Sequence, residues 1–125
     1  MIKILLVEDN EISQKMMYYT FRHVGLTSDL AADGFEAVRM ATESNYDVIL
    51  MDIMMPGIDG YDATARIREH EATSGHKSII IGLTGNVYDS ERKKCIEAGM
   101  DSYMTKPFDI DVFRIEISHF GLSID

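Results

Sequence analysis

The sequence has few of the features that mark secreted and membrane proteins. Its single cysteine, Cys95, excludes an internal disulfide framework and favours a reducing compartment. The apolar opening MIKILLV gives way to Glu8 and Asp9, which is too early for the core of a signal peptide. No apolar run approaches the length that spans a bilayer. We therefore expect a soluble, cytoplasmic protein without a membrane partner.

Basic residues are also scarce. The chain carries 12 Lys and Arg against 21 Asp and Glu, which gives a formal net charge of −9. This acidity argues against nucleic acids and anionic membranes as partners, and it favours cations or basic protein surfaces. No linker or low-complexity segment divides the 125 residues. We expect residues 1–125 to form one domain with no output domain.

Short apolar runs alternate along the chain with longer amphipathic segments. The runs are IKILLV (2–7), TSDLAA (27–32), DVILM (47–51), SIIIGL (78–83) and DSYMT (101–105). The first, third and fourth runs are nearly continuous in apolar residues, which is typical of strands covered on both faces. The other two runs are weaker and predict edge strands.

Helical patterns fill the intervals between these runs. They cover residues 11–24, 34–44, 60–71, 87–98 and 109–120. Asp33 and Asp59 are candidate N-caps, and Gly99 and Gly121 are candidate stops. Repeated strand–helix alternation predicts an α/β fold with a doubly wound parallel sheet and helices on both faces. Ligands of such sheets bind beyond the carboxyl ends of the strands.

Polar residues stand where four of the predicted strands end. Glu8 and Asp9 follow the first strand, Asp52 the third, Thr84 the fourth and Lys106 the fifth. Each alone has an ordinary explanation as a helix cap, a turn residue or a surface charge. Together, three carboxylates would crowd one pocket and repel one another, which a divalent cation relieves. Oxygen ligands select a hard ion such as Mg²⁺.

The same grouping favours phosphoryl transfer. Asp52 would act as a nucleophile beside the cation, while the Thr84 hydroxyl and the Lys106 ammonium meet further oxygens. Positioning and charge neutralisation supply most of the catalysis in such reactions. The expected product is an aspartyl phosphate.

Four segments resemble the motifs of response-regulator receiver domains of two-component signalling. They are VEDN (7–10), ILMDIMMPGIDG (49–60), LTG (83–85) and YMTKPF (103–108). The resemblance covers essentially the whole chain in family order, and it is strongest to receivers of hybrid histidine kinases and phosphorelays. It implies a flavodoxin-like (βα)5 fold with a five-stranded parallel sheet in the order 2-1-3-4-5.

The resemblance also implies roles for individual residues. Asp52 matches the phosphoacceptor, and Glu8 and Asp9 match the acidic pair that holds Mg²⁺ with it. Met54 matches the position whose backbone carbonyl also binds the metal. The implied donor is a histidine kinase or a histidine phosphotransfer domain, and the domain would catalyse only its own phosphorylation and dephosphorylation.

Further matches imply a switch. Thr84 corresponds to the hydroxyl that moves onto the phosphoryl group, and Lys106 corresponds to the lysine that pairs with that group. Tyr103 matches the aromatic that turns inward when the threonine moves and so alters a surface for a downstream protein target. An ordinary half-buried strand aromatic is the alternative for Tyr103.

Two positions depart from the common pattern of the family. Gly85 stands where alanine usually follows the threonine, which loosens the loop. Met54 and Asn86 occupy positions that line access to the phosphate in this family. An apolar Met54 cannot orient an attacking water with its side chain, whereas the Asn86 amide could. We predict slower self-dephosphorylation than in relatives with a polar residue at position 54.

The first helix allows two interpretations. Ile12, Met16, Thr20 and Val24 fall on one face and predict a stripe toward the core, while Met17, Tyr18 and Phe21 widen the apolar arc. The wider arc is either a broad core contact or a docking face for a histidine-bearing helix.

Two other functional classes stay open at this point. A Mg²⁺-dependent phosphatase with an aspartate nucleophile would usually carry a second aspartate two residues later, where Met54 stands. A flavodoxin-like binding module would carry the carboxylates incidentally.

Overall fold

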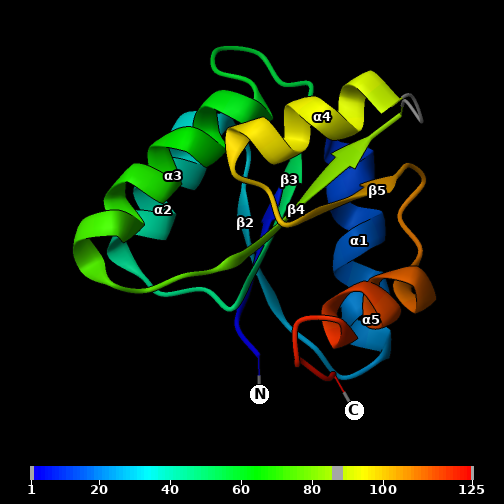
Figure 1. Cartoon of the computed structure of the whole chain (residues 1–125). Coiled ribbons are helices and arrows are strands. Elements are labelled where there is room, and N and C mark those ends of the chain that lie inside the picture. Colours follow the sequence, from blue (N-terminus) through cyan, green and yellow to red (C-terminus); the bar gives the residue numbers. More distant parts are fainter. Residues whose placement is uncertain (1, 86–88, 125) are drawn as a thin grey trace.

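The computed structural model describes residues 2–85 and 89–124, which form one parallel sheet between two layers of helices (Figure 1). The strands are β1 (Ile4–Val7), β2 (Ser28–Ala31), β3 (Val48–Asp52), β4 (Ile79–Thr84) and β5 (Ser102–Thr105). The helices are α1 (Glu11–His23), α2 (Gly34–Glu43), α3 (Gly60–Ser74), α4 (Asp89–Ala98) and α5 (Ile110–Ser118).

The sheet has the order β2-β1-β3-β4-β5, and all neighbouring strands pair in parallel. This confirms the predicted flavodoxin-like order and the predicted edge positions of the two weaker runs. Every residue of β1 and β3 is buried, whereas β2 and β5 are partly exposed. Continuous apolar runs therefore mark the strands that helices cover on both faces.

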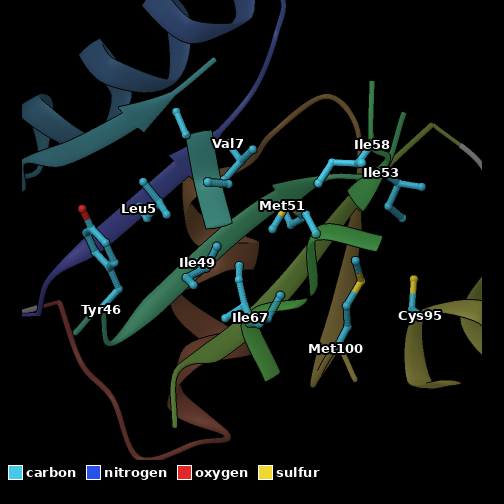
Figure 2. Close-up of a cluster of buried hydrophobic side chains, with 14 residues drawn as sticks. Leu5, Val7, Tyr46, Ile49, Met51, Ile53, Ile58, Ile67, Cys95 and Met100 are labelled. Carbon is cyan, nitrogen blue, oxygen red and sulfur yellow. The ribbon is translucent and has the colours of Figure 1, made fainter. Parts of the chain in front are cut away.

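Successive side chains of each strand enter opposite cores. In β1, Leu5 and Val7 join a cluster with α2, α3 and α4, which we call the α2–α4 core; Figure 2 shows part of it. Ile4 and Leu6 point the other way, into a cluster with α1 and α5, which we call the α1/α5 core. Cys95 is buried in the α2–α4 core, as its place in the fourth helical pattern suggests.

Side-chain caps set the helix starts. Asn10 accepts a hydrogen bond from the Ser13 N–H, and Asp33 and Asp59 cap α2 and α3 in the same way, as predicted for those two. The predicted end of α3 at residue 71 is wrong, because the helix continues to Ser74. No glycine or proline interrupts residues 71–74, and the helix stops where Gly75 adopts a φ of 83°. The predicted start of the fourth helix, at residue 87, lies outside the described residues.

The predicted core stripe of the first helix is wrong. Met17 and Phe21 face the sheet, whereas Ile12 and Met16 are 71% and 63% exposed. The ring of Phe21 packs against Phe113 of α5 at 5.4 Å between centroids, and this aromatic contact fixes which face of α1 turns inward. The apolar residues Ile12 and Met16 are thereby left on the surface.

A polar network ties α3 to the loops that lead into β4 and β5. The Arg68 guanidinium donates to the carbonyls of Gly99 and Ser78, and it pairs with Glu71 and Asp101, each at 2.7 Å. Glu71 in turn accepts hydrogen bonds from the backbone N–H and the hydroxyl of Ser78. The network lies at the amino ends of β4 and β5, whereas the predicted site lies at the carboxyl ends of the strands.

No helix of the described residues is long and apolar enough to cross a bilayer.

The Glu71 contacts predict a pH-dependent contribution to stability. Burial alone would raise the pKa of Glu71, but the hydrogen bonds from Ser78 and the Arg68 charge lower it below its ordinary value of 4.5. A folded-state pKa below the unfolded one stabilises the fold above the unfolded pKa, and that contribution is lost as pH falls. We expect Glu71→Gln to lower the free energy of unfolding by about 2 kcal/mol at pH 7.

The deficit of Glu71→Gln should shrink as pH falls below about 4. Urea unfolding at several pH values measures it. The matched control is Glu43→Gln, which removes an exposed carboxylate 3.0 Å from Arg39 and should cost less than about 1 kcal/mol. Equal losses in the two variants would contradict the assignment.

Candidate functional site

The carboxyl ends of the strands bring the predicted polar residues together. Glu8 and Asp9 directly follow β1, and Asp52 is the last residue of β3. One oxygen from each of these three carboxylates can be chosen so that all lie within 4.8 Å of one another. Thr84 ends β4 and is buried, and Lys106 follows β5. The donor set is all oxygen, which fits a hard divalent cation such as Mg²⁺.

Two of the three carboxylates are buried. Glu8 and Asp52 are each 1% exposed, whereas Asp9 is open to solvent. Burying a charge without a partner is costly, and Lys106 is the partner of both. Its Nζ lies 2.9 Å from Asp52 Oδ1 and 3.6 Å from Glu8 Oε2.

One lysine does not neutralise this pocket. Burial raises the pKa of Asp52, and the hydrogen bond and charge of Lys106 offset the shift only in part. Burial likewise raises the pKa of Glu8 against a hydrogen bond from the Asn10 N–H, and the Asp52 charge adds to the rise. Burial alone would lower the pKa of Lys106, yet its hydrogen bond with Asp52 and the two carboxylate charges raise it. The pocket therefore favours additional positive charge.

The backbone of Asp52 packs tightly against the start of α3. A Cβ on Gly60 would lie 2.5 Å from the carbonyl oxygen of Asp52 and 2.8 Å from the Cα of Ile53. The Gly60 N–H also donates to the Ile53 carbonyl at 2.9 Å. Sequence reasoning did not single out Gly60, although this glycine ends the motif that surrounds Asp52. Its role is to let α3 approach the strand that carries the carboxylate.

Met54 combines a nearby backbone with a solvent-exposed side chain. Its N–H lies 3.4 Å from Asp52 Oδ1, so the chain turns beside the carboxylate. Its side chain is 76% exposed. The exposure agrees with a residue at the mouth of the pocket, while its carbonyl as a metal ligand stays a prediction. Asn86, the other residue predicted at this mouth, lies outside the described residues.

The two predicted switch residues lie on neighbouring strands. Tyr103 is half-buried in β5 against the α2–α4 core. Thr84 of β4 pairs in register with Thr105, which follows Tyr103 by two residues in β5. Gly85 is exposed, and a Cβ there would meet nothing within 4 Å. The half-burial of Tyr103 suits both a switch and an ordinary strand aromatic, so its role stays a prediction.

An apolar groove leads out of the pocket beside α1. It has a volume of about 420 Å³ between Met16 and Met17 of α1 and Phe108 after β5, and Glu8 and Lys106 also line it. Met17 belongs to the core, which supports the core interpretation for the inner part of the arc. Met16 and the neighbouring Ile12 remain outside.

A family model matches almost the entire chain. The model describes the response regulator receiver domain, and it matches residues 4–118. Among curated proteins, Hybrid signal transduction histidine kinase G of Dictyostelium discoideum is 37% identical over 122 residues, which cover 96% of this chain and 4% of that protein. The chain spans 4% to 12% of the length of the first curated relatives that it matches.

Solved structures give the same likeness. The receiver domain of sensor histidine kinase PA1611 from Pseudomonas aeruginosa, with a magnesium ion coordinated in its active site cleft, is 41% identical with a TM-score of 0.83, and the match covers 97% of this chain and 98% of that one. The receiver domain of Ssk1 from Saccharomyces cerevisiae, solved with the histidine phosphotransfer protein Ypd1, is 30% identical with a TM-score of 0.88, covering 96% and 88%.

The contact of Gly60 with Asp52 predicts contrasting effects for two alanine substitutions. Gly60→Ala gains at most about 1 kcal/mol of helix propensity, but the overlap with backbone atoms costs about 1–3 kcal/mol. We therefore expect a net loss of unfolding free energy for Gly60→Ala. Gly85→Ala, which enters open space, should stay within about 0.5 kcal/mol of the unsubstituted protein. Urea denaturation measures both, and a Gly60→Ala protein as stable as Gly85→Ala would refute the close contact.

Proposed function

Since this chain belongs to the family of response regulator receiver domains, we propose that it takes a phosphoryl group from a phosphohistidine onto Asp52 with Mg²⁺ bound beside it. Its similarity to hybrid histidine kinases confirms the subfamily predicted from the motifs. The observation that carries the proposal is the pocket in which Glu8, Asp9 and Asp52 converge, with the Lys106 ammonium 2.9 Å from Asp52.

The chain's own residues supply the acceptor and its surroundings. An Asp52 oxygen forms the new bond to phosphorus, the phosphorus–nitrogen bond breaks, and the imidazole leaves with the bonding electron pair. Bound Mg²⁺ would neutralise phosphoryl oxygens and hold them in place, with Glu8, Asp9, Asp52 and the Met54 carbonyl as its protein ligands. The magnesium site of the Pseudomonas receiver supports this assignment.

Lys106 and Thr84 would receive the phosphoryl group. Once Asp52 carries the phosphoryl group as a mixed anhydride, its carboxylate charge is gone, and the Lys106 ammonium would pair with a phosphoryl oxygen in its place. The Thr84 hydroxyl, at the end of the adjacent strand, would move onto another phosphoryl oxygen. Tyr103 would then turn inward and change the surface near α4, β5 and α5 that a downstream protein reads.

The donor would dock over the mouth of this pocket. Ile12 and Met16 stand exposed beside the groove that leads to Lys106, and they suit an apolar contact with a histidine-bearing helix. The complex of the Ssk1 receiver with Ypd1 supports a histidine phosphotransfer protein, or a histidine kinase, as the partner. Because Met17 is buried, the proposed docking face moves from Met17 to Ile12 and Met16, while Tyr18, which is 43% exposed, stays a candidate contact.

The proposed function has three further parts. We expect the domain to catalyse only its own phosphorylation and dephosphorylation, to act in the cytoplasm and to signal by protein binding.

Incubation with acetyl phosphate and Mg²⁺ tests the acceptor. We expect a covalent adduct of one phosphoryl group, detected by intact-protein mass spectrometry, in the unsubstituted protein but not in Asp52→Ala. The matched control Asp62→Ala removes an exposed carboxylate of α3 and should leave the adduct unchanged. Omission of Mg²⁺ should abolish adduct formation, because the pocket then carries uncompensated negative charge.

Each alternative function has its own outcome in this experiment. Steady release of inorganic phosphate without an adduct would indicate a phosphatase. No reaction at all would indicate a binding module whose carboxylates are incidental. An adduct that survives in Asp52→Ala would place the acceptor elsewhere.

Met54 predicts a long-lived phosphoryl group. Its exposed thioether does not orient an attacking water, so the side chain at position 54 does not help to position the nucleophile of hydrolysis. We expect Met54→Asn to shorten the lifetime of the adduct, followed by mass spectrometry after removal of acetyl phosphate. Met54→Leu is the matched control and should leave the lifetime unchanged. The proposal fails if Met54→Asn decays no faster than Met54→Leu.

A further inference from the structure

The loop that carries the acidic pair passes from the sheet to α1 within a few residues. The last strand contact is the Glu8 N–H, which donates to the Ala31 carbonyl at 3.1 Å. The next contacts come from the helix side, where the Asn10 N–H donates to Glu8 Oε1 at 3.0 Å and the Asn10 side chain caps α1. Asp9 lies between these two anchors, beyond the end of β1, and is exposed.

Gln14 holds this loop on both sides of Asp9. Its side-chain Nε2 donates to the carbonyl of Glu8 at 2.6 Å. Its backbone N–H donates to the carbonyl of Asn10 at 2.9 Å. Any residue at position 14 except proline would supply the backbone bond, but the bond to the Glu8 carbonyl requires a side chain that is long enough and carries a hydrogen-bond donor. Gln14 itself is half-buried against the loop.

A fixed carbonyl also fixes the residue that follows it. The Glu8 carbonyl and the Asp9 N–H belong to one planar peptide unit. A hydrogen bond to that oxygen therefore sets the orientation of the plane and the direction in which the Asp9 Cα leaves it. Because the Asp9 carboxylate is exposed, the plane of its peptide is the main constraint on where that carboxylate can reach.

We propose that Gln14 is a positioning residue that aims the Asp9 carboxylate at the cation site. The inference rests on the proposed function, since it concerns the same pocket. Removing a group that orients a metal ligand from outside the coordination sphere typically lowers metal affinity by about 10- to 100-fold. Gln14 does this from α1, through the main chain.

The test introduces methionine at each of two adjacent positions, 14 and 15, in separate variants. Gln14→Met keeps the length and helix propensity of the side chain but removes the amide donor. Lys15→Met places the same side chain one residue along, at an exposed position. Calorimetric titration with MgCl₂ measures the dissociation constant of each protein. We expect that constant to rise about tenfold in Gln14→Met and to stay unchanged in Lys15→Met.

Two further measurements separate positioning from a general loss of stability. At saturating Mg²⁺, the rate of adduct formation from acetyl phosphate should return to that of the unsubstituted protein. In the metal-free protein, hydrogen exchange at the Asp9 and Asn10 amides should quicken in Gln14→Met, while exchange along β1 stays unchanged. If Gln14→Met does not fold, Gln14→Leu takes its place.

The outcomes distinguish this inference from the proposed function. If the unsubstituted protein binds no Mg²⁺, the proposed function fails. If the unsubstituted protein binds Mg²⁺ and Gln14→Met binds it equally well, the positioning role is overturned. A loss of adduct formation that excess Mg²⁺ does not restore would also overturn it.

Discussion

The pairing of Lys106 with two buried carboxylates is the interaction on which the site depends. Glu8 and Asp52 are withdrawn from water at the ends of the two central strands, and only a cation at that place makes their burial tolerable. With Asp9 included, three carboxylates face one ammonium. The pocket thus carries an excess of negative charge. A divalent cation would balance this excess and would also attract the oxygens of a phosphoryl group.

Helix starts on both faces of the sheet determine where those carboxylates lie. On one face, α3 approaches so closely at Gly60 that the backbone of Asp52 has no room to shift. On the other, the first turn of α1 holds the loop after β1 through Asn10 and Gln14. Asp52 is therefore positioned by packing and Glu8 by hydrogen bonds. The two kinds of support predict different effects of substitution. A side chain at Gly60 would overlap with the backbone and lower stability, whereas loss of the Gln14 hydrogen bond would change the orientation of the loop and lower its affinity for a cation.

Local patterns predicted most of the fold and the charged residues that the structure brings together at the strand ends, and they failed where a distant contact decides. Continuous apolar runs identify the central strands, and Asp33 and Asp59 mark helix starts by chemistry that is local to a few residues. The inward face of α1 is different, since Ile12 and Met16 show the same helical spacing as Met17 and Phe21. A ring on α5, far along the chain, selects between them. The Gln14 bond to the Glu8 carbonyl is equally hidden, because it depends on the path of the loop.

The few buried contacts of α4 with the rest of the domain explain how a movement of Thr84 would change the surface at α4. Among the α4 residues whose burial is described, Cys95 alone is buried, and the Tyr61 hydroxyl adds a hydrogen bond from α3 to Glu91. An element with so few buried contacts can shift at little cost in free energy. By contrast, Met17 and Phe21 bury the inner face of α1 in an aromatic cluster. The helix beside the apolar groove, α1, is therefore held firmly, and α4 is held loosely. This difference suits the proposed function, in which a donor docks near α1 and the response to Thr84 appears at α4.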